Sequence, residues 1–248
     1  MKKLLIGMPT YDGNIDFQTQ AAVYRETAGY AERVVASQQS SLLANCCNQL
    51  YCIALNDREQ YGWFMLWHSD IRIKDPGLVS GLLAEMQRLG AGCISVLMPI
   101  KDEKGLTSTG LYYRDAQKKK RRRRLTMREA MQLPETFSAE HLIKFWDAPS
   151  SSALLVNTGL LLLDLSQPWA EKIYFNIRDR IIRQSDGKFV GVVDPEDWNL
   201  SRQLHELKVP VFCTRKYLAF HKGVGLYANQ GDWGRWQTDN IWNEIEIP

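Results

Sequence analysis

The chain has 248 residues, a net charge of +3, 45% apolar residues and 24% charged residues, which is the balance of an ordinary globular protein. This length can bury a full hydrophobic core. Because no apolar stretch approaches the roughly 20 residues that span a bilayer, the sequence argues against a membrane-spanning protein. The five cysteines are odd in number and form no CxxC pair, so we expect reduced core thiols, a cytoplasmic location and no zinc site.

Elements in the first half of the chain are predicted from apolar periodicity and from residues that break it. A strand is expected at residues 3–8, ended by the loop at 9–13, and a helix from Ser40 or Ser41 to about Leu55. A second strand follows at Tyr61, then a helix over 78–89 that ends at Gly90, and a strand over 93–98.

The second half continues the alternation. One or two strands lie within 153–165, and a helix starts after Ser166 and runs to about residue 184. A further helix spans about 194–207, followed by a strand at 209–220 that ends at His221. Alternating strands and helices predict an α/β fold with an open twisted, mostly parallel sheet flanked by helices.

The stretch at residues 61–73, YGWFMLWHSDIRI, is the most informative motif. Its aromatic, apolar run is typical of a strand buried on both faces. The polar residues His68, Ser69 and Asp70 follow at once, where open α/β sheets bind ligands. An acid there costs desolvation energy unless a metal ion, a phosphate–metal complex or a sugar hydroxyl pairs with it.

Several standard sites are missing from the sequence. No GxGxxG follows the first strand, and there is no P-loop, no GxSxG elbow and no HExxH. The chemistry is therefore expected from acids and histidines at strand ends.

The order of the motifs resembles the GT-A class of nucleotide-sugar glycosyltransferases. Pro-Thr ends the first strand, x-x-Asp ends a mid-chain strand, and Asn-x-Gly, Glu-Asp-Trp and His-x-Gly follow. The resemblance covers roughly residues 3–225. With His-Ser-Asp at 68–70 and GLTST at 105–109, it is closest to phage-type enzymes, some of whose relatives glycosylate hydroxymethylated pyrimidines in DNA.

This resemblance implies a GT-A-like Rossmann-type fold with a basic insertion, in the host cytoplasm if the protein is viral. Residues 1–230 would form one catalytic domain, with 1–100 as the donor-nucleotide half, 101–150 as the basic, acceptor-side insertion and 151–230 as the acceptor half. An aromatic tail at 231–248 carries three tryptophans.

The resemblance also assigns roles to residues. A divalent cation, Mn²⁺ or Mg²⁺, would bridge the donor diphosphate and neutralise charge on the leaving group. His68 stands where the usual motif has an acid, and the alternative is a turn-capping Asp above a packed His. The implied metal ligands are Asp70, His221 and His68, and the implied donor-binding residues are Pro9, Thr10, Tyr11, Asp12, Asn45 (or Asn48) and Ser69.

Glu196 and Asp197 match the pair in which inverting relatives keep a general base. A carboxylate within hydrogen-bond reach of the acceptor hydroxyl is needed for direct displacement. The same residues would also make a favourable acidic helix start. The implied acceptor side comprises Asn157, Thr158, Gly159 and Trp198, where the glycine is either a close approach to substrate or a bulge in a core strand.

Charge is distributed unevenly. Residues 114–128 contain nine Lys or Arg and one acid, and the remainder of the chain carries 22 basic and 27 acidic residues, a net charge of −5. We expect the seven consecutive cations to stay out of the core, as a solvated mobile loop, a nucleic-acid-binding segment or a contact for an anionic membrane. The candidate nucleic-acid-binding residues are Lys118, Lys119, Lys120, Arg121, Arg122, Arg123 and Arg124.

Three functions remain open from the sequence. The leading one is a metal-dependent glycosyltransferase that uses a nucleotide sugar, of which a UDP-sugar is the commonest type, with hydroxymethylated pyrimidine in DNA as the favoured acceptor. The second is a non-catalytic nucleic-acid-binding protein on a GT-A-like scaffold. The third is a nucleotidyltransferase, which also uses acids at strand ends.

Overall fold

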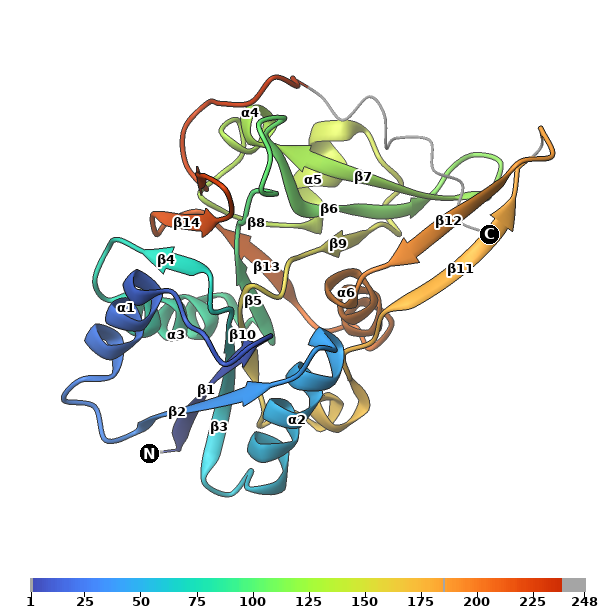
Figure 1. Ribbon diagram of the computed structural model, residues 1–248. Coiled ribbons are helices and arrows are strands. Elements are labelled where there is room, and N and C mark those ends of the chain that lie inside the picture. The colour runs from blue at the N-terminus through green and yellow to red at the C-terminus, as the bar shows by residue number, and fades with distance from the viewer. Residues whose placement is uncertain (1, 185, 238–248) are drawn as a thin grey trace.

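A seven-stranded sheet forms the centre of the computed structural model, which describes residues 2–184 and 186–237 (Figure 1). Its strand order is β2-β1-β3-β10-β5-β13-β8, and only β10 and β8 run against the other five strands. The predicted fold class, an open and mostly parallel α/β sheet, is confirmed. The strands are β1 (Lys3–Thr10), β2 (Arg33–Gln39), β3 (Tyr61–Trp67), β5 (Cys93–Val96), β8 (Thr136–Ser138), β10 (Leu160–Asp164) and β13 (Val211–Thr214).

Helices cover both faces of this sheet because successive strand residues point to opposite sides. Phe64 and Leu66 pack in one core with α2 and α6, whereas Met65 and Trp67 pack in the other with α1 and α3. The strand at Tyr61 is therefore buried on both faces, as predicted. The helices are α1 (Phe17–Thr27), α2 (Leu43–Asn56), α3 (Leu78–Leu89), α4 (Met127–Ala130), α5 (Ala139–Trp146) and α6 (Glu196–Glu206).

Three small sheets surround the central one. They contain β15-β14-β4, β7-β6-β9 and the hairpin β11-β12, which extends beyond the body of the protein in Figure 1. The strands are β4 (Ile71–Ile73), β6 (Leu106–Arg114), β7 (Lys120–Thr126), β9 (Ala153–Leu155), β11 (Arg178–Arg183), β12 (Phe189–Asp194), β14 (Ala219–Lys222) and β15 (Leu226–Ala228).

The helix predicted from Ser166 to residue 184 is wrong. Only the 3₁₀ turn Pro168–Lys172 is helical, and β11 follows. β11, with two adjacent isoleucines, pairs with the Val-rich β12, and β-branched residues favour a pleated strand over a helix. The predicted strand at 209–220 is also divided, into β13 and β14, which belong to different sheets.

The basic run is not a mobile loop and is not excluded from the core. Residues 120–124 lie in β7, which pairs with β6, and the Arg122 residue is 7% exposed. A guanidinium group can be buried here because acidic partners neutralise it. The expectation of a purely solvated segment was therefore wrong.

The five cysteines are free, and four of them are buried as predicted, but Cys52 is exposed. In the described residues, no helix combines the length and apolar composition that crossing a bilayer requires. Of the predicted aromatic tail, residues 231–237 are described, whereas 238–248, including Trp242, lie outside the described residues.

Candidate functional site

The predicted metal-site residues come together at the carboxyl end of β3. His68 directly follows β3, and its backbone N–H donates to the carbonyl of Gly159 at 2.8 Å. Asp70 lies in the turn before β4, and β4 pairs with β14, with His221 opposite Ile71. As a result, His221 Nε2 lies 3.8 Å from Asp70 Oδ2. The three predicted residues share one site, although His68 and His221 are 153 positions apart in the chain.

Histidine protonation at this site is set by burial. Burial lowers the pKa of His68 to about 4 and also lowers the pKa of His221, so both rings are neutral at pH 7. His221 Nδ1 donates to the carbonyl of Pro99 at 2.8 Å, which leaves the lone pair of Nε2 on the side of Asp70.

Lys101, which the sequence analysis missed, completes the site. Its ammonium group forms an ion pair with Asp70 Oδ2. Burial by itself would raise the pKa of Asp70, but the hydrogen bond from Lys101 and the proximity of His221 bring it below its usual range. The signal available in the sequence was position alone, since Lys101 follows β5 by a few residues and β5 is parallel to β3 in strand direction.

A divalent cation fits these residues in part. Asp70 Oδ1 and His68 Nε2 are buried and have no hydrogen-bond partner among the described residues. His221, with one ring nitrogen on a backbone carbonyl and the other towards a carboxylate, has the arrangement common among metal-ligating histidines. However, Lys101 holds the carboxylate, and no group of three or more His, Cys, Asp or Glu side chains in the described part of the chain is close enough to hold one ion as it stands.

A half-buried clamp of Asp16, Arg72 and Lys222 fixes the chain around Asp70 and His221. Asp16 caps α1 through the N–H groups of Gln18 and Thr19, and it accepts two hydrogen bonds from Arg72, at 2.7 and 2.8 Å. Lys222 Nζ adds a third cationic contact at 2.6 Å. Arg72 holds the pKa of Asp16 far below its usual range. Because Arg72 and Lys222 flank Asp70 and His221, this clamp positions both site residues.

The predicted donor loop lies at the end of β1. Pro9 and Thr10 are buried in the strand, and the Thr10 hydroxyl donates to the carbonyl of Gln38. Tyr11, in contrast, is 74% exposed, and the exposed Asp12 accepts two hydrogen bonds from Asn14, which lower its pKa. Tyr11 and Asp12 are therefore the members of this loop that a ligand can reach.

The other predicted donor residues differ in their surroundings. Asn45 is exposed in the first turn of α2, whereas the Asn48 side chain holds both backbone polar groups of Phe175, at 2.7 and 2.8 Å. The side-chain amide of Asn48 is thus engaged in a structural contact. Ser69 is half-buried, and its carbonyl accepts from the N–H of Asp16.

The segment Asn157-Thr158-Gly159 connects the two halves of the site. The Asn157 amide donates to the Val96 carbonyl at 2.7 Å, and its Oδ1 is buried without a partner among the described residues. Thr158 Oγ1 lies 3.1 Å from Glu196 Oε1, while the next carbonyl, that of Gly159, accepts from His68. Through these two consecutive residues, Glu196 is connected to the chain at the end of β3. A Cβ at Gly159 would come within 2.6 Å of Ile71, which explains the glycine.

Glu196 and Asp197 form a buried acidic pair in the first turn of α6. Burial, reinforced by the neighbouring Glu196 charge, raises the pKa of Asp197 to about 8. Burial also raises the pKa of Glu196. The backbone N–H of Trp198 donates to Asp197 Oδ1 at 2.7 Å, so the pair shares features of a helix start and of a proton-transfer site.

Trp198, predicted for the acceptor side, is buried, and its indole N–H donates to the carbonyl of Ser108 at 2.8 Å. The guanidinium groups of Arg122 and Arg124 lie 4.7 and 4.4 Å from its ring centre. These contacts hold β7 against α6, so Trp198 has a structural role next to Glu196 and Asp197.

The remaining cations of the run also have structural contacts. Arg121 pairs with Asp115 at 2.8 Å, Arg122 with Asp194 at 3.0 Å, and Arg123 with Glu129 at 2.8 Å. Lys118 occupies the β6–β7 turn with a φ of 62°. Nucleic-acid binding by Lys118–Arg124 stays a prediction, but three of its seven cations are engaged with acids inside the protein.

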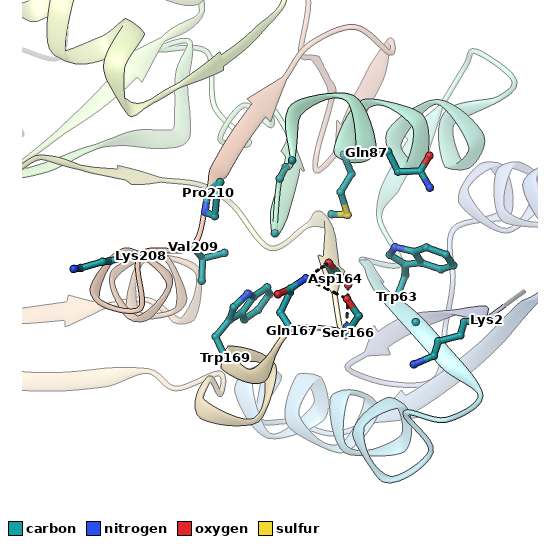
Figure 2. Close-up of a pocket in the computed structure, with 15 residues that line it drawn as sticks. Lys2, Trp63, Gln87, Asp164, Ser166, Gln167, Trp169, Lys208, Val209 and Pro210 are labelled. Atoms are coloured by element: carbon teal, nitrogen blue, oxygen red, sulfur yellow. Dashed lines mark hydrogen bonds between the residues drawn. The ribbon is translucent and has the colours of Figure 1, made fainter.

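A separate pocket of about 620 Å³ opens at the opposite, amino-terminal edge of the sheet (Figure 2). It is lined by residues at the starts of β3 and β5 and by segments before β13 and after β10. The sequence analysis did not predict this pocket, because no local motif marks it.

Comparison with known proteins gives a likeness of fold only. No family model matches the chain, and no curated protein matches it. The crystal structure of A197 from STIV matches with a TM-score of 0.52 at 13% identity, over 95% of this chain and 98% of that one. Weaker matches include S. aureus TarS 1–349 in complex with UDP (TM-score 0.43, 11% identity, 87% of this chain and 59% of that one) and apo-UDP-glucose pyrophosphorylase (0.40, 8%, 88% and 76%). The chain therefore shares its α/β fold, over almost its whole length, with A197.

Proposed function

We propose that this protein is a glycosyltransferase that takes a sugar from a nucleotide sugar, with a UDP-sugar as the first donor to test. The observation that carries the proposal is the convergence of two chemically different groups. Asp70, His221 and Lys101 lie at the end of β3, and Glu196 and Asp197 are linked to that end through Thr158 and Gly159.

The first group suits the leaving diphosphate. The Lys101 ammonium supplies positive charge beside Asp70, and the exposed Tyr11 and Asp12 offer an aromatic ring and a carboxylate to the nucleoside. Charge on the departing phosphate is stabilised by fixed cations in a partly dehydrated site.

The second group suits proton removal from the acceptor hydroxyl. A carboxyl group with a pKa near the working pH combines a useful ionised fraction with enough basicity. Asp197, whose pKa burial raises to about 8, has this property, and Glu196, bonded to Thr158, is its partner. We assign Asp197 as the base and Glu196 as the neighbouring charge that adds to the effect of burial on its pKa.

A Mn²⁺ or Mg²⁺ ion remains part of the proposal. Asp70 Oδ1 and His68 Nε2, both without partners among the described residues, and His221 Nε2 would hold it. Such an ion would neutralise negative charge on the diphosphate. Lys101 acts on the same carboxylate, so the ammonium group and the ion are alternatives there.

The acceptor we propose to test first is hydroxymethylated pyrimidine in DNA. Its support is the charge of residues 114–128, nine cations and one acid, within an otherwise acidic chain. Cations of this density bind phosphate backbones without reading sequence.

Thermal shift with a panel of nucleotide sugars, with and without Mn²⁺, tests the donor half. A donor present at 100 times its dissociation constant stabilises the protein by about 2.7 kcal/mol. The best donor is then incubated with hydroxymethylated and unmodified DNA, and product is detected as a mass increase. Asp70→Ala is expected to abolish transfer, and full transfer by that variant would overturn the site assignment.

Other outcomes separate the alternatives. Release of pyrophosphate without a nucleoside diphosphate would indicate a nucleotidyltransferase. Binding to DNA without binding to any nucleotide sugar would indicate a non-catalytic protein. Transfer to a lipid, glycan or protein, with none to DNA, would refute the DNA acceptor and retain the enzyme class.

A further inference from the structure

The pocket at the amino-terminal edge of the sheet is separate from the proposed catalytic site. Gly62 and Trp63 belong to the start of β3, whereas His68 follows its end, and a strand of this length spans about 20 Å. A volume of about 620 Å³ lies within the range of about 300–1,000 Å³ typical of small-molecule sites. The two sites therefore can bind different ligands at the same time.

Two tryptophans define the pocket, and both are half-buried. In Figure 2, Trp63 and Trp169 stand on opposite sides of a polar group formed by Asp164, Ser166 and Gln167. Neither indole N–H has a hydrogen-bond partner among the described residues.

Four of the five other tryptophans in the described residues behave differently; the exception is Trp236, whose indole N–H also has no hydrogen-bond partner there and whose ring lies 5.0 Å from Lys104 Nζ. The indole N–H groups of Trp67, Trp146, Trp198 and Trp233 each donate to a carbonyl or carboxylate oxygen, at 2.8–3.1 Å. A half-buried tryptophan usually places its N–H on a partner, so Trp63 and Trp169 each offer an apolar face and an unused donor to the pocket.

The position of Trp169 is fixed by the absence of a side chain at Gly92. A Cβ at Gly92 would lie 2.9 Å from the Trp169 ring and 2.5 Å from the Val209 side chain. The ring therefore packs against the start of β5. A preformed aromatic surface costs little conformational entropy when a ligand binds.

The planar carboxylate and amide groups of the pocket keep hydrogen-bonding capacity that the described residues do not use. Asp164 accepts from the N–H of Ser166 at 2.9 Å and from the Gln167 amide at 3.3 Å, which leaves lone pairs on the carboxylate. The side-chain amide of Gln87, on the far wall, has no hydrogen bond within the described chain. Carboxylate and amide groups can each bind two neighbouring hydroxyl groups of one ligand.

We infer that this pocket is a carbohydrate-binding site that takes a neutral pyranose, alone or as a unit of a short oligosaccharide. A pyranose has C–H faces that pack on indole rings and a rim of hydroxyls that needs both donors and acceptors. The pocket supplies the faces with Trp63 and Trp169 and the rim with Asp164, Gln87 and the indole N–H groups. Its exposed cations, Lys2 and Lys208, are accompanied by Asp164, so the lining has no strong excess of positive charge for a phosphate.

The test uses the full chain and neutral trisaccharides of glucose, galactose, mannose and N-acetylglucosamine at millimolar concentration. Indole N–H signals in ¹H–¹⁵N spectra report binding directly, and the signals of Trp63 and Trp169 are identified by their loss in Trp63→Phe and Trp169→Phe. We expect at least one trisaccharide to shift both signals and to leave those of Trp67 and Trp198 unchanged. No shift with any of the four sugars, or shifts spread over all indoles, would overturn the proposal.

Variants then test the polar half without removing packing. Asp164→Asn and Gln87→Ala are each expected to raise the dissociation constant for the sugar about tenfold. Trp236→Ala, the control at another partly exposed tryptophan, is expected to leave it unchanged. Wild-type affinity in both Asp164→Asn and Gln87→Ala would contradict the assignment. Asp70→Ala is expected to bind the sugar normally, so failure of the proposed transferase activity and failure of this site are told apart.

Discussion

The two edges of the central sheet differ in the kinds of side chain that they hold. At the carboxyl-terminal edge, ionisable groups are buried or half-buried and shifted in pKa, as Asp70, His68 and Asp197 illustrate. At the amino-terminal edge, the pocket is lined by two tryptophans that pack on the core but whose indole N–H groups have no hydrogen-bond partner among the described residues. The first edge holds groups whose shifted pKa values suit chemistry, and the second holds a preformed surface that suits ligand binding.

This difference teaches which variants are informative. Changes at the carboxyl-terminal edge alter charge and should affect rates and pH profiles, whereas changes at the amino-terminal edge alter shape and should affect affinity alone. A variant at the amino-terminal edge that changed the pH profile, or one at the carboxyl-terminal edge that changed affinity alone, would contradict this comparison.

The largest effect is expected from Asp197→Asn. Loss of the base should lower transfer by about 10²- to 10⁴-fold. Wild-type activity should rise with pH towards about 8, because only the ionised carboxylate accepts a proton. Initial rates between pH 5 and 9 measure both effects, and an unchanged pH profile in the variant would show that another group is the base.

The same residue predicts how stability changes with pH. Asp197 keeps its proton in the folded protein up to about pH 8, but in the unfolded chain it ionises near pH 4. Between these values the folded state binds more protons, so the free energy of unfolding falls as pH rises. Urea unfolding of wild type and Asp197→Asn at pH 5 and 8 checks this, with a smaller decline expected in the variant.

Asp16→Ala is expected to reduce the free energy of unfolding by about 2–3 kcal/mol, through loss of the α1 cap and of a nearly buried partner for Arg72. Donor affinity should fall as well, since the clamp positions Asp70 and His221, while trisaccharide affinity should not. Glu171→Ala, which removes a largely exposed partner of Arg58, is the control and should cost less than about 1 kcal/mol. Equal losses in both variants would refute the clamp.

Gly92→Ala should affect the other edge. The added methyl group meets Val209 and Trp169, and overpacking of this kind costs about 1–3 kcal/mol. Displacement of Trp169 should weaken trisaccharide binding, with nucleotide-sugar binding retained in thermal shift. Gly191→Ala, at a glycine with nothing within 4 Å of the added Cβ, is the matched control.

Lys101→Met gives the smallest change in stability, because both partners of the Lys101–Asp70 pair are about one-third exposed. It frees the Asp70 carboxylate, so Mn²⁺ should bind more tightly than to wild type. Metal titration followed by thermal shift measures this. Weaker Mn²⁺ binding in the variant would mean that Lys101 and the ion do not compete.

Sequence patterns were sufficient where burial is strong and local. The run at Tyr61 predicted β3, and the acidic start at Glu196 predicted α6, because both have clear apolar or capping signatures. Two early elements, α1 and β2, were not predicted. Both are largely polar: α1 buries only four residues, and the edge strand β2 buries none.

The site was predictable to the extent that it depends on strand ends. The ends of the predicted strands indicated Asp70 and His221, but the pairing of β4 with β14 that brings the two residues together was not predicted. Lys101 could not be placed, since its position depends on the course of a loop after β5. The amino-terminal pocket was inaccessible to sequence analysis because Trp63, Trp169 and Val209 are far apart in the chain and share no motif.

The basic strand β7 has a consequence for protein engineering. Its arginines form ion pairs with Asp115 and Glu129, which flank the strand in sequence, and with Asp194 at the end of β12. A deletion of this strand would therefore remove the arginine partner of Glu129 and one of the three arginines that contact Asp194, beside Arg180 and Arg202, and would damage the fold. Charge-preserving exchanges, such as Arg122→Lys, or changes confined to Lys118 are the informative variants, because the cations of this strand serve as internal counterions of the molecule.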